Sequence, residues 1–286
     1  MTIFAFGLVL VSAALHATWN FLSKRAGGDT TFVWIFSVIA TLIYLPLAIA
    51  IVIIQKPQLG APELTALAMT CLLHIMYYLF LNWGYQVGDL SLVYPIARGA
   101  GPLLASIGAI IILGERPSLL AVGGMLLISV GIVILTGSSS SKHHGSVRMG
   151  IIYGLLTAVA IGAYTLQDKQ VVGFYLVPPL ILTWASNLVR AVALAPNALR
   201  HWNRVKLNWQ KYKREAFSVG VLDSLSYILF LIALSTGSVT QLSPLRQTSI
   251  LIGAFLGTRL LSEEGGRRRM FAALVMMIGV VVLAVG

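Results

Sequence analysis

Long apolar segments alternate with short polar ones along the whole chain of 286 residues. Each segment is close to the roughly 20 apolar residues that one transmembrane helix needs. The pattern predicts an all-α integral membrane protein of ten transmembrane helices, in which the first segment is a span and not a cleaved signal. The predicted spans are 3–22, 31–54, 62–86, 91–113, 117–136, 149–168, 177–196, 215–236, 239–261 and 268–285.

A serine-rich polar tract separates the first five segments from the last five. Residues 138–148 have the composition of a flexible linker, so we expect one repeat over 1–137 and a second over 149–286. The repeats share marker residues at a constant offset of 149, namely Gly88 and Gly237, Pro95 and Pro244, and Glu115 and Glu264.

The number of spans in each repeat determines their relative orientation. Five is odd, so the second repeat must lie upside down relative to the first. Inverted repeats of this kind are typical of alternating-access carriers, whose substrate site lies near the bilayer midplane between the repeats. The first and sixth segments match at an offset of 145, which sets Trp19 over Tyr164.

Composition excludes most soluble classes. Of all residues, 58% are hydrophobic and 10% are charged, whereas a soluble domain carries about a quarter charged. The single cysteine, Cys71, permits neither an intrachain disulfide nor a cysteine metal cluster, so a packing role is expected. The net charge of +11 fits cytoplasmic loops that face anionic lipid and not a nucleic-acid partner. We expect no metal, no cofactor and no catalytic residues.

Lysine and arginine are unequally divided between the loops of the two sides. If the ten segments cross in turn, one side carries fourteen of these residues and the other carries three. The positive-inside rule then predicts that both termini face outward. Six of the fourteen lie in 198–215, whose apolar residues recur at helical spacing. This segment is interpreted as an amphipathic helix at the headgroups, with a docking or regulatory helix as the alternative.

Three motifs carry a family resemblance over essentially the whole chain: His16–Asn20, Gly88–Pro95 and Leu113–Pro117. With them the sequence resembles the drug/metabolite transporter superfamily, in particular its bacterial branch with two EamA domains, and within it the YddG exporters of aromatic amino acids. The resemblance implies a multi-pass carrier of the bacterial inner membrane. It also implies cytoplasmic termini, contrary to the distribution of basic residues.

Ionisable side chains inside the spans are the first candidates for substrate contact, because a charge in the membrane is costly. His74 and Tyr78 lie one turn apart on one helix face, and the offset of 149 sets them over Asp223 and Tyr227. Facing each other, His74 and Asp223 could hold the charged ends of a zwitterion or relay a proton. The alternative is that His74 packs against a neighbouring helix and that Asp223 lies near a water-filled mouth.

Arg98 and Arg246 form a second matched pair, each two or three residues after a proline that can kink its helix. Either arginine could bind a substrate carboxylate through two hydrogen bonds or extend to the headgroups. Aromatic and uncharged polar side chains complete the candidate set. These are Trp19, Asn20, Tyr94, Tyr164 and Gln247.

The resulting hypothesis is a secondary active or facilitative transporter that exports amino acids, with aromatic and other neutral ones favoured, by alternating access. The expected partners are a small-molecule substrate and the lipid bilayer, and the chain is expected to act as a monomer. A broader drug or metabolite efflux carrier is the nearest alternative. An intramembrane enzyme is disfavoured because the metalloprotease motif His-Glu-x-x-His is absent.

Overall fold

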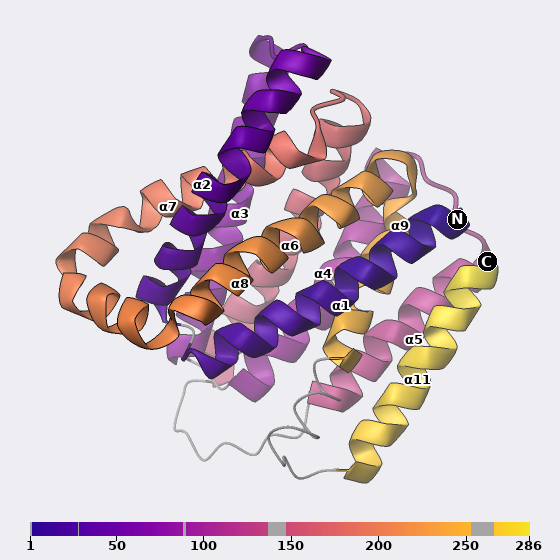
Figure 1. The fold of residues 1–286 in the computed structure, drawn as a ribbon. Coiled ribbons are helices and arrows are strands. Elements are labelled where there is room, and N and C mark those ends of the chain that lie inside the picture. The colour runs from indigo at the N-terminus through magenta and orange to yellow at the C-terminus, as the bar shows by residue number, and fades with distance from the viewer. Residues whose placement is uncertain (1, 28, 88–89, 137–146, 253–265) are drawn as a thin grey trace.

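The computed structural model describes residues 2–27, 29–87, 90–136, 147–252 and 266–286, which form helices and contain no strand (Figure 1). The predicted linker lies almost wholly outside these residues. The helices are α1 (Ile3–Arg25), α2 (Thr30–Gln55), α3 (Ala61–Val87), α4 (Leu90–Ile112), α5 (Leu119–Thr136), α6 (Val147–Gly173), α7 (Pro179–Arg200), α8 (Trp202–Thr236), α9 (Val239–Arg246) and α11 (Gly266–Val285).

Six of the helices in the described ranges are long and apolar enough to cross a membrane, namely α1, α2, α3, α6, α7 and α8. Shorter apolar helices lie at 96–112, 119–134 and 271–285. Many large apolar side chains on the helices face outward, such as Ile54, Ile111 and Leu119. The chain is therefore a multi-pass membrane protein whose apolar exterior is covered by lipid.

Local signals explain several helix ends. Asp29 precedes α2, and one of its carboxylate oxygens accepts the Phe32 amide at 2.8 Å. Lys56 ends α2 in the left-handed conformation. Pro179 begins α7, where a missing amide hydrogen costs nothing.

The predicted ninth span, 239–261, is interrupted within its described part. Helix α9 stops at Arg246, and bonds of the i to i+3 type join Gln247 to Pro244 and Ile250 to Gln247. Pro244 has no amide hydrogen to donate to Thr240, which weakens the preceding turn. The interruption places Arg246 at a helix end, as the proline predicts.

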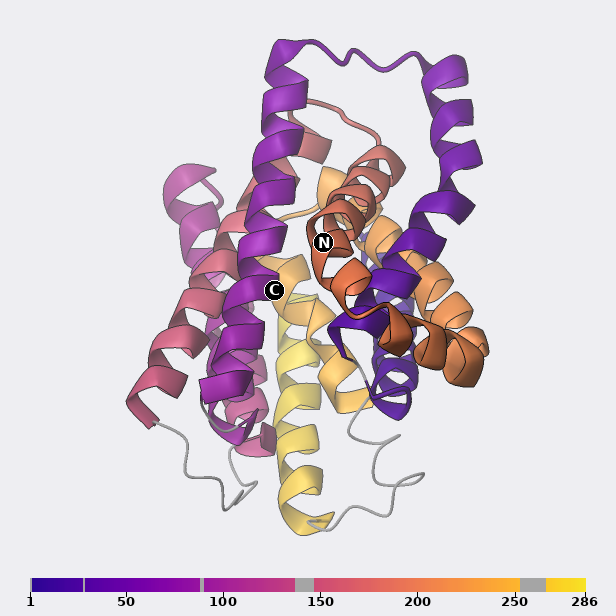
Figure 2. The ribbon, with the colours of Figure 1, turned by 90° about the vertical axis from the view of Figure 1, so that its left-hand side faces the viewer.

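The principal helix contacts join one half of the chain to the other (Figures 1 and 2). Helix α1 packs on α8, and their repeat counterparts α6 and α3 pack on each other in the same way. Helices α2 and α7, which correspond at the offset of 149 residues, also pack together, as do α5 and α11. The packing therefore repeats about an approximate two-fold relation between the halves.

Contact registers give the direction of these pairs. Between α2 and α7, Thr41 contacts Trp184 and Ser37 contacts Arg190, so the two helices run antiparallel. Between α5 and α11, a β-carbon on Gly124 would meet the amide nitrogen of Leu283 at 2.6 Å, and one on Gly131 would meet the Met276 side chain at 2.4 Å. Corresponding helices thus run in opposite directions, and glycine lets α5 and α11 approach closely.

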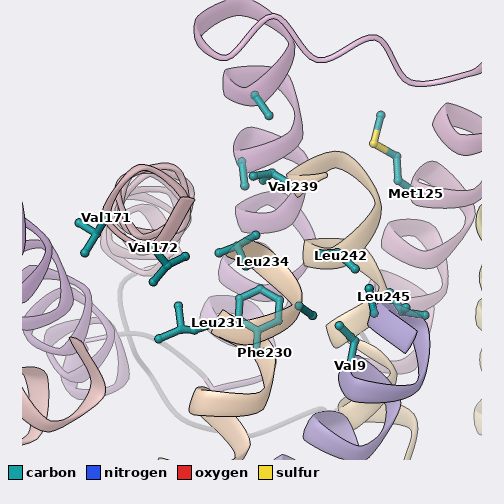
Figure 3. Close-up of a cluster of buried hydrophobic side chains, with 14 of the residues drawn as sticks. Val9, Met125, Val171, Val172, Phe230, Leu231, Leu234, Val239, Leu242 and Leu245 are labelled. Carbon is teal, nitrogen blue, oxygen red and sulfur yellow. The ribbon is translucent and has the colours of Figure 1, made fainter. Parts of the chain in front are cut away.

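A buried apolar cluster joins the helices around the α8–α9 connection (Figure 3). Phe230, Leu231 and Leu234 of α8 pack with Val239, Leu242 and Leu245 at and after the turn, and with Val9, Met125, Val171 and Val172 of the neighbouring helices. Packing of this kind makes the centre of the bundle rigid enough to position polar groups.

The basic segment 198–215 is mostly helical, as predicted, but it is continuous with the next span. Helix α8 begins at Trp202 and is kinked at Tyr212, whose φ is −128°. The Asn208 side chain donates to Asp29 at 2.9 Å and to Thr31 at 2.7 Å. These bonds attach the basic segment to the start of α2.

Candidate substrate site

A buried carboxylate lies where α3, α6 and α8 meet. Asp168 of α6 has no exposed surface, and its oxygens accept hydrogen bonds from the hydroxyl groups of Thr70 and Tyr227. His74 Nε2 lies 3.1 Å from the second of these oxygens and 3.2 Å from the Tyr227 hydroxyl oxygen. This network stabilises a charge that would be costly without partners inside a membrane protein.

Aromatic rings surround His74. Tyr164 stacks on the imidazole with 4.3 Å between ring centroids, and Tyr227 meets it edge-on at 5.5 Å. Tyr77 packs edge-on against Tyr164 at 5.6 Å. The His74 side chain is 22% exposed, whereas that of Asp168 is 0% exposed. The histidine therefore connects the buried carboxylate to accessible space.

Arg246 lies against the other side of Tyr227. Its guanidinium carbon is 4.8 Å from the Tyr227 ring centroid and 4.4 Å from that of Phe230, distances typical of cation–π contacts. Arg246 Nε is buried and has no hydrogen-bond partner among the described residues. Because Arg246 contacts Tyr227 and Phe230 of the apolar part of α8, it lies in the interior of the bundle.

Helix α1 contributes further unpaired nitrogen atoms. The rings of His16 and Trp19 meet edge-to-face at 4.9 Å, and His16 Nδ1 and Trp19 Nε1 are buried without a partner in the described ranges. Helix α1 packs on α8 and also contacts α9, the helix of Arg246. Buried polar atoms normally have partners, so these nitrogens mark a place where water or a ligand binds.

Each half contributes one arginine to this region. Arg98 of α4 donates to the Tyr77 hydroxyl at 3.3 Å, and Tyr77 packs against Tyr164, which stacks on His74. Two permanent positive charges thus lie near one buried carboxylate. We call this group the central site, and it consists of His16, Trp19, His74, Tyr77, Arg98, Tyr164, Asp168, Tyr227 and Arg246.

The prediction that His74 faces Asp223 is wrong. Asp223 is bonded to Arg190 of α7 at 3.0 Å, and Arg190 also donates to Ser37 at 2.8 Å and to Asn187 at 2.6 Å. The guanidinium lies 5.2 Å from the Phe36 ring centroid. A nearer cation on the adjacent helix therefore neutralises Asp223, and His74 pairs with Asp168.

Several other predicted residues lie apart from the centre. Tyr78 turns toward the start of α2, where its side chain hydrogen-bonds with that of Thr30. Asn20 is exposed and donates to the His16 carbonyl of its own helix at 2.7 Å. Gln247 is buried, and its side-chain amide lies 3.4 Å from the Ser243 carbonyl. The Tyr94 side chain lies outside the part of the chain that the structure describes.

The sequence analysis missed Asp168 and Arg190. Asp168 was assigned to the last position of a predicted span, 149–168, although α6 continues to Gly173. Arg190 lies within the predicted span 177–196, and the cost of a charge inside a span was the signal that could have identified both residues. No group of three or more histidine, cysteine or acidic side chains that could hold a metal occurs among the described residues.

A second polar arrangement holds the turn between α8 and α9. Both carboxylate oxygens of Glu115 accept first-turn amides of α9, from Val239 at 2.7 Å and Thr240 at 3.0 Å. The Lys169 ammonium donates to the carbonyls of Leu234, Ser235 and Gly237 at 2.8, 3.2 and 2.9 Å. An open pocket of about 460 Å³ adjoins both side chains. Each charge complements the helix end that it contacts.

The fold and the sequence both have known relatives. Of the solved structures, 29 chains match, and one of them, described only as "Crystal structure of protein", superposes with a TM-score of 0.80. That match covers 98% of this chain and 96% of the other at 16% sequence identity, so it shows the fold alone. No curated protein sequence matches.

The model of the EamA-like transporter family matches residues 3–137 and again 148–285. The two matches together span nearly the whole chain, and the two matched segments are those whose helices correspond in the fold. The chain therefore belongs to the EamA-like transporter family, whose members move small molecules across membranes, and it carries two EamA repeats.

Proposed function

We propose that the protein exports amino acids, with aromatic and other neutral ones favoured, across the bacterial inner membrane by alternating access. The single observation that carries the proposal is the central site. One arginine from each half lies there beside aromatic rings and buried unpaired nitrogen atoms.

The carboxylate end of such a substrate fits the arginine side of the site. Arg246 Nε and Trp19 Nε1 are buried donors without a partner among the described residues, and Arg98 adds a second guanidinium nearby. A guanidinium binds a carboxylate through two parallel hydrogen bonds, which fixes its orientation.

The side chain of the substrate fits the aromatic part of the site. Trp19, Tyr164 and Tyr227 offer ring faces and edges that suit a planar apolar group. The same surface suits other neutral side chains by burial alone, which explains why aromatic amino acids are favoured and not required.

Alternating access follows from the relation between the halves. We infer ten spans in two inverted repeats, 1–137 and 149–286, with the site near the midplane. The antiparallel pairs α2–α7 and α5–α11 support this arrangement, because each brings a helix of one half against its counterpart. Rocking of one half against the other around the central site would open it to each side in turn.

Transport into liposomes tests the proposal. Purified protein, reconstituted and preloaded with unlabelled phenylalanine, should exchange it for external labelled phenylalanine. Unlabelled phenylalaninamide, which lacks the carboxylate, should compete poorly. Arg246→Gln should raise the half-saturation concentration of phenylalanine about tenfold or more. Arg204→Gln, on the basic surface of α8, should leave it unchanged. Absence of exchange by folded protein would refute the proposal for this substrate.

A broader metabolite or drug efflux carrier is the second candidate, and family membership favours it equally. The same assay separates the two. Competition by apolar cations or by sugars that matches competition by amino acids would favour the broader carrier.

A further inference from the structure

We propose that Asp168 is the subsite for the substrate amino group and that a proton on His74 excludes that group from it. The inference rests on the proposed function, because it assumes a substrate with an ammonium group. It adds Asp168 to the proposed substrate contacts and a proton on His74 as a second ligand, and it states that this proton and the substrate amino group exclude each other.

The first step concerns the partners of Asp168. The carboxylate is fully buried, and the groups that donate to it in the described structure are two hydroxyls, of Thr70 and Tyr227, and the His74 imidazole. Hydroxyls carry no charge. When Asp168 is ionised, the positive charge that balances it therefore comes from protonated His74 or from a ligand.

The second step concerns the other charged and titratable groups near Asp168. Lys169 follows it in the chain but is bonded to three carbonyls at the end of α8. Arg246 of α9 is stacked on Tyr227 and Phe230, and Arg98 of α4 donates to Tyr77. Arg190 of α7 is bonded to Asp223. The remaining titratable neighbours are Cys71 and Tyr77 of α3, Tyr164 of α6 and Tyr227 of α8.

The third step concerns space. Thr70 occupies one oxygen of Asp168, and Tyr227 and His74 share the other. Asp168 is 0% exposed, so an ammonium group reaches it only where a neighbouring side chain makes room, and His74 is the donor with 22% of its side chain exposed. Neutral His74 can yield its place without leaving a charge unbalanced. An imidazolium beside an ammonium would set two cations on one carboxylate, with both arginines nearby, and this is strongly unfavourable.

Exclusion of one cation by the other couples their movements. In the conformation open to one side, the proton leaves His74 for water and a substrate ammonium takes its place at Asp168. In the conformation open to the other side, the substrate departs and a proton from water returns to His74. One proton crosses inward for each amino acid that crosses outward when the carrier changes conformation only with one of the two cations at Asp168.

The test measures exchange of labelled phenylalanine at equal pH on both sides of the liposome, from pH 5.5 to 8.5. Competition predicts that the half-saturation concentration of phenylalanine rises as the pH falls, and that the rise approaches about tenfold per pH unit in the acid part of the range. In wild-type protein, 3-phenylpropionate, which lacks the amino group, should compete with little dependence on pH. His74→Gln, which keeps a neutral donor, should flatten the profile for phenylalanine. A profile that stays steep in that variant would overturn the proposal.

Asp168→Asn supplies a second, independent reading. It should remove the preference for phenylalanine over 3-phenylpropionate, whereas Asp223→Asn, the matched control, should retain it. An unchanged preference in folded Asp168→Asn protein would also overturn the proposal.

Phenethylamine distinguishes failure of this inference from failure of the proposed function. If the wild type does not exchange phenylalanine, protection of the solubilised protein against heating by phenethylamine, lost in Asp168→Asn, would retain the amino-group subsite and reject only the amino-acid cargo. No protection would reject both.

Discussion

Two carboxylates lie inside the bundle, and their surroundings differ. Asp223 is bonded to a permanent cation, Arg190, which two further side chains hold in place. Asp168 is bonded to two hydroxyls and to an imidazole, and it is the more deeply buried of the two. The first carboxylate has a permanent cation as its partner, whereas we propose that a proton on His74 or a ligand supplies the positive charge for the second.

This difference separates structural from functional charge. An ion pair between α7 and α8 satisfies itself and leaves nothing for a substrate to bind. A carboxylate without a permanent counter-ion is complete only when a proton or a ligand arrives. The number of charges in a span therefore says less about a transport site than the identity of their partners.

The largest expected effect breaks the fixed pair. Arg190→Met leaves Asp223 partly buried without its cation, so we expect a loss of about 3 kcal/mol in the free energy of unfolding, at the low end for buried pairs because both side chains keep some exposure. Thermal unfolding of the solubilised protein measures it.

The double variant Arg190→Met with Asp223→Leu is the control, because it removes both charges. It should recover most of the lost stability. If the double variant were as unstable as the single one, the loss would not come from the unpaired charge of Asp223, and Arg190 and Asp223 would not simply neutralise each other.

The second effect removes one donor from each carboxylate environment. Tyr227→Phe takes away a hydrogen bond to the charged Asp168, for which we expect about 1.5 kcal/mol. Tyr44→Phe takes away a neutral bond, from the Tyr44 hydroxyl to the Val221 carbonyl at 2.9 Å near Asp223, and should cost less. Equal losses in thermal unfolding would argue that Asp168 is uncharged in the resting protein.

How much of the fold could be predicted from the sequence is clear at α2 and α6. Residues 31–54 were predicted and Thr30–Gln55 is helical, because a continuous apolar run and the capping Asp29 define that helix locally. Helix α6 exceeds its prediction because Asp168 and Lys169 find partners on other helices, and Val171 and Val172 after them are buried. Charged residues such as these are expected from the sequence to end a helix. They lie within it when side chains or backbone groups of other helices bond to them.

The site was harder to predict for a related reason. Periodicity tells which residues share a helix face, as His74 and Tyr78 do. It does not tell which helix lies opposite: α3 packs chiefly on α6, and Asp223 of α8 pairs with Arg190 of α7. The partners of His74 and of Tyr78 depend on that choice, so the sequence favoured Asp223 where the fold brings Asp168.

The third effect replaces Asp168, the carboxylate that we propose binds the substrate amino group. Asp168→Asn should change the free energy of unfolding by less than about 1 kcal/mol, because the lost hydrogen bonds are offset by removal of a buried charge that lacks a permanent counter-ion. The contrast with Arg190→Met is the sharpest form of the comparison. A loss as large as that of Arg190→Met, measured in the same thermal unfolding experiment, would assign Asp168 a structural role.

The smallest effect extends the comparison to a third carboxylate. Glu115 lies outside the central site and accepts backbone amides of α9, so a helix end stabilises its charge, and Lys169 lies across the same pocket. Glu115→Gln keeps an acceptor for one of these amides and loses the charge, and charges at helix ends contribute about 0.3–1 kcal/mol. We expect a loss of about 0.5 kcal/mol in thermal unfolding and no change in the pH profile of exchange. A shifted pH profile would mean that the α8–α9 turn takes part in proton coupling, and the distinction between fixed and responsive carboxylates would then have to include it.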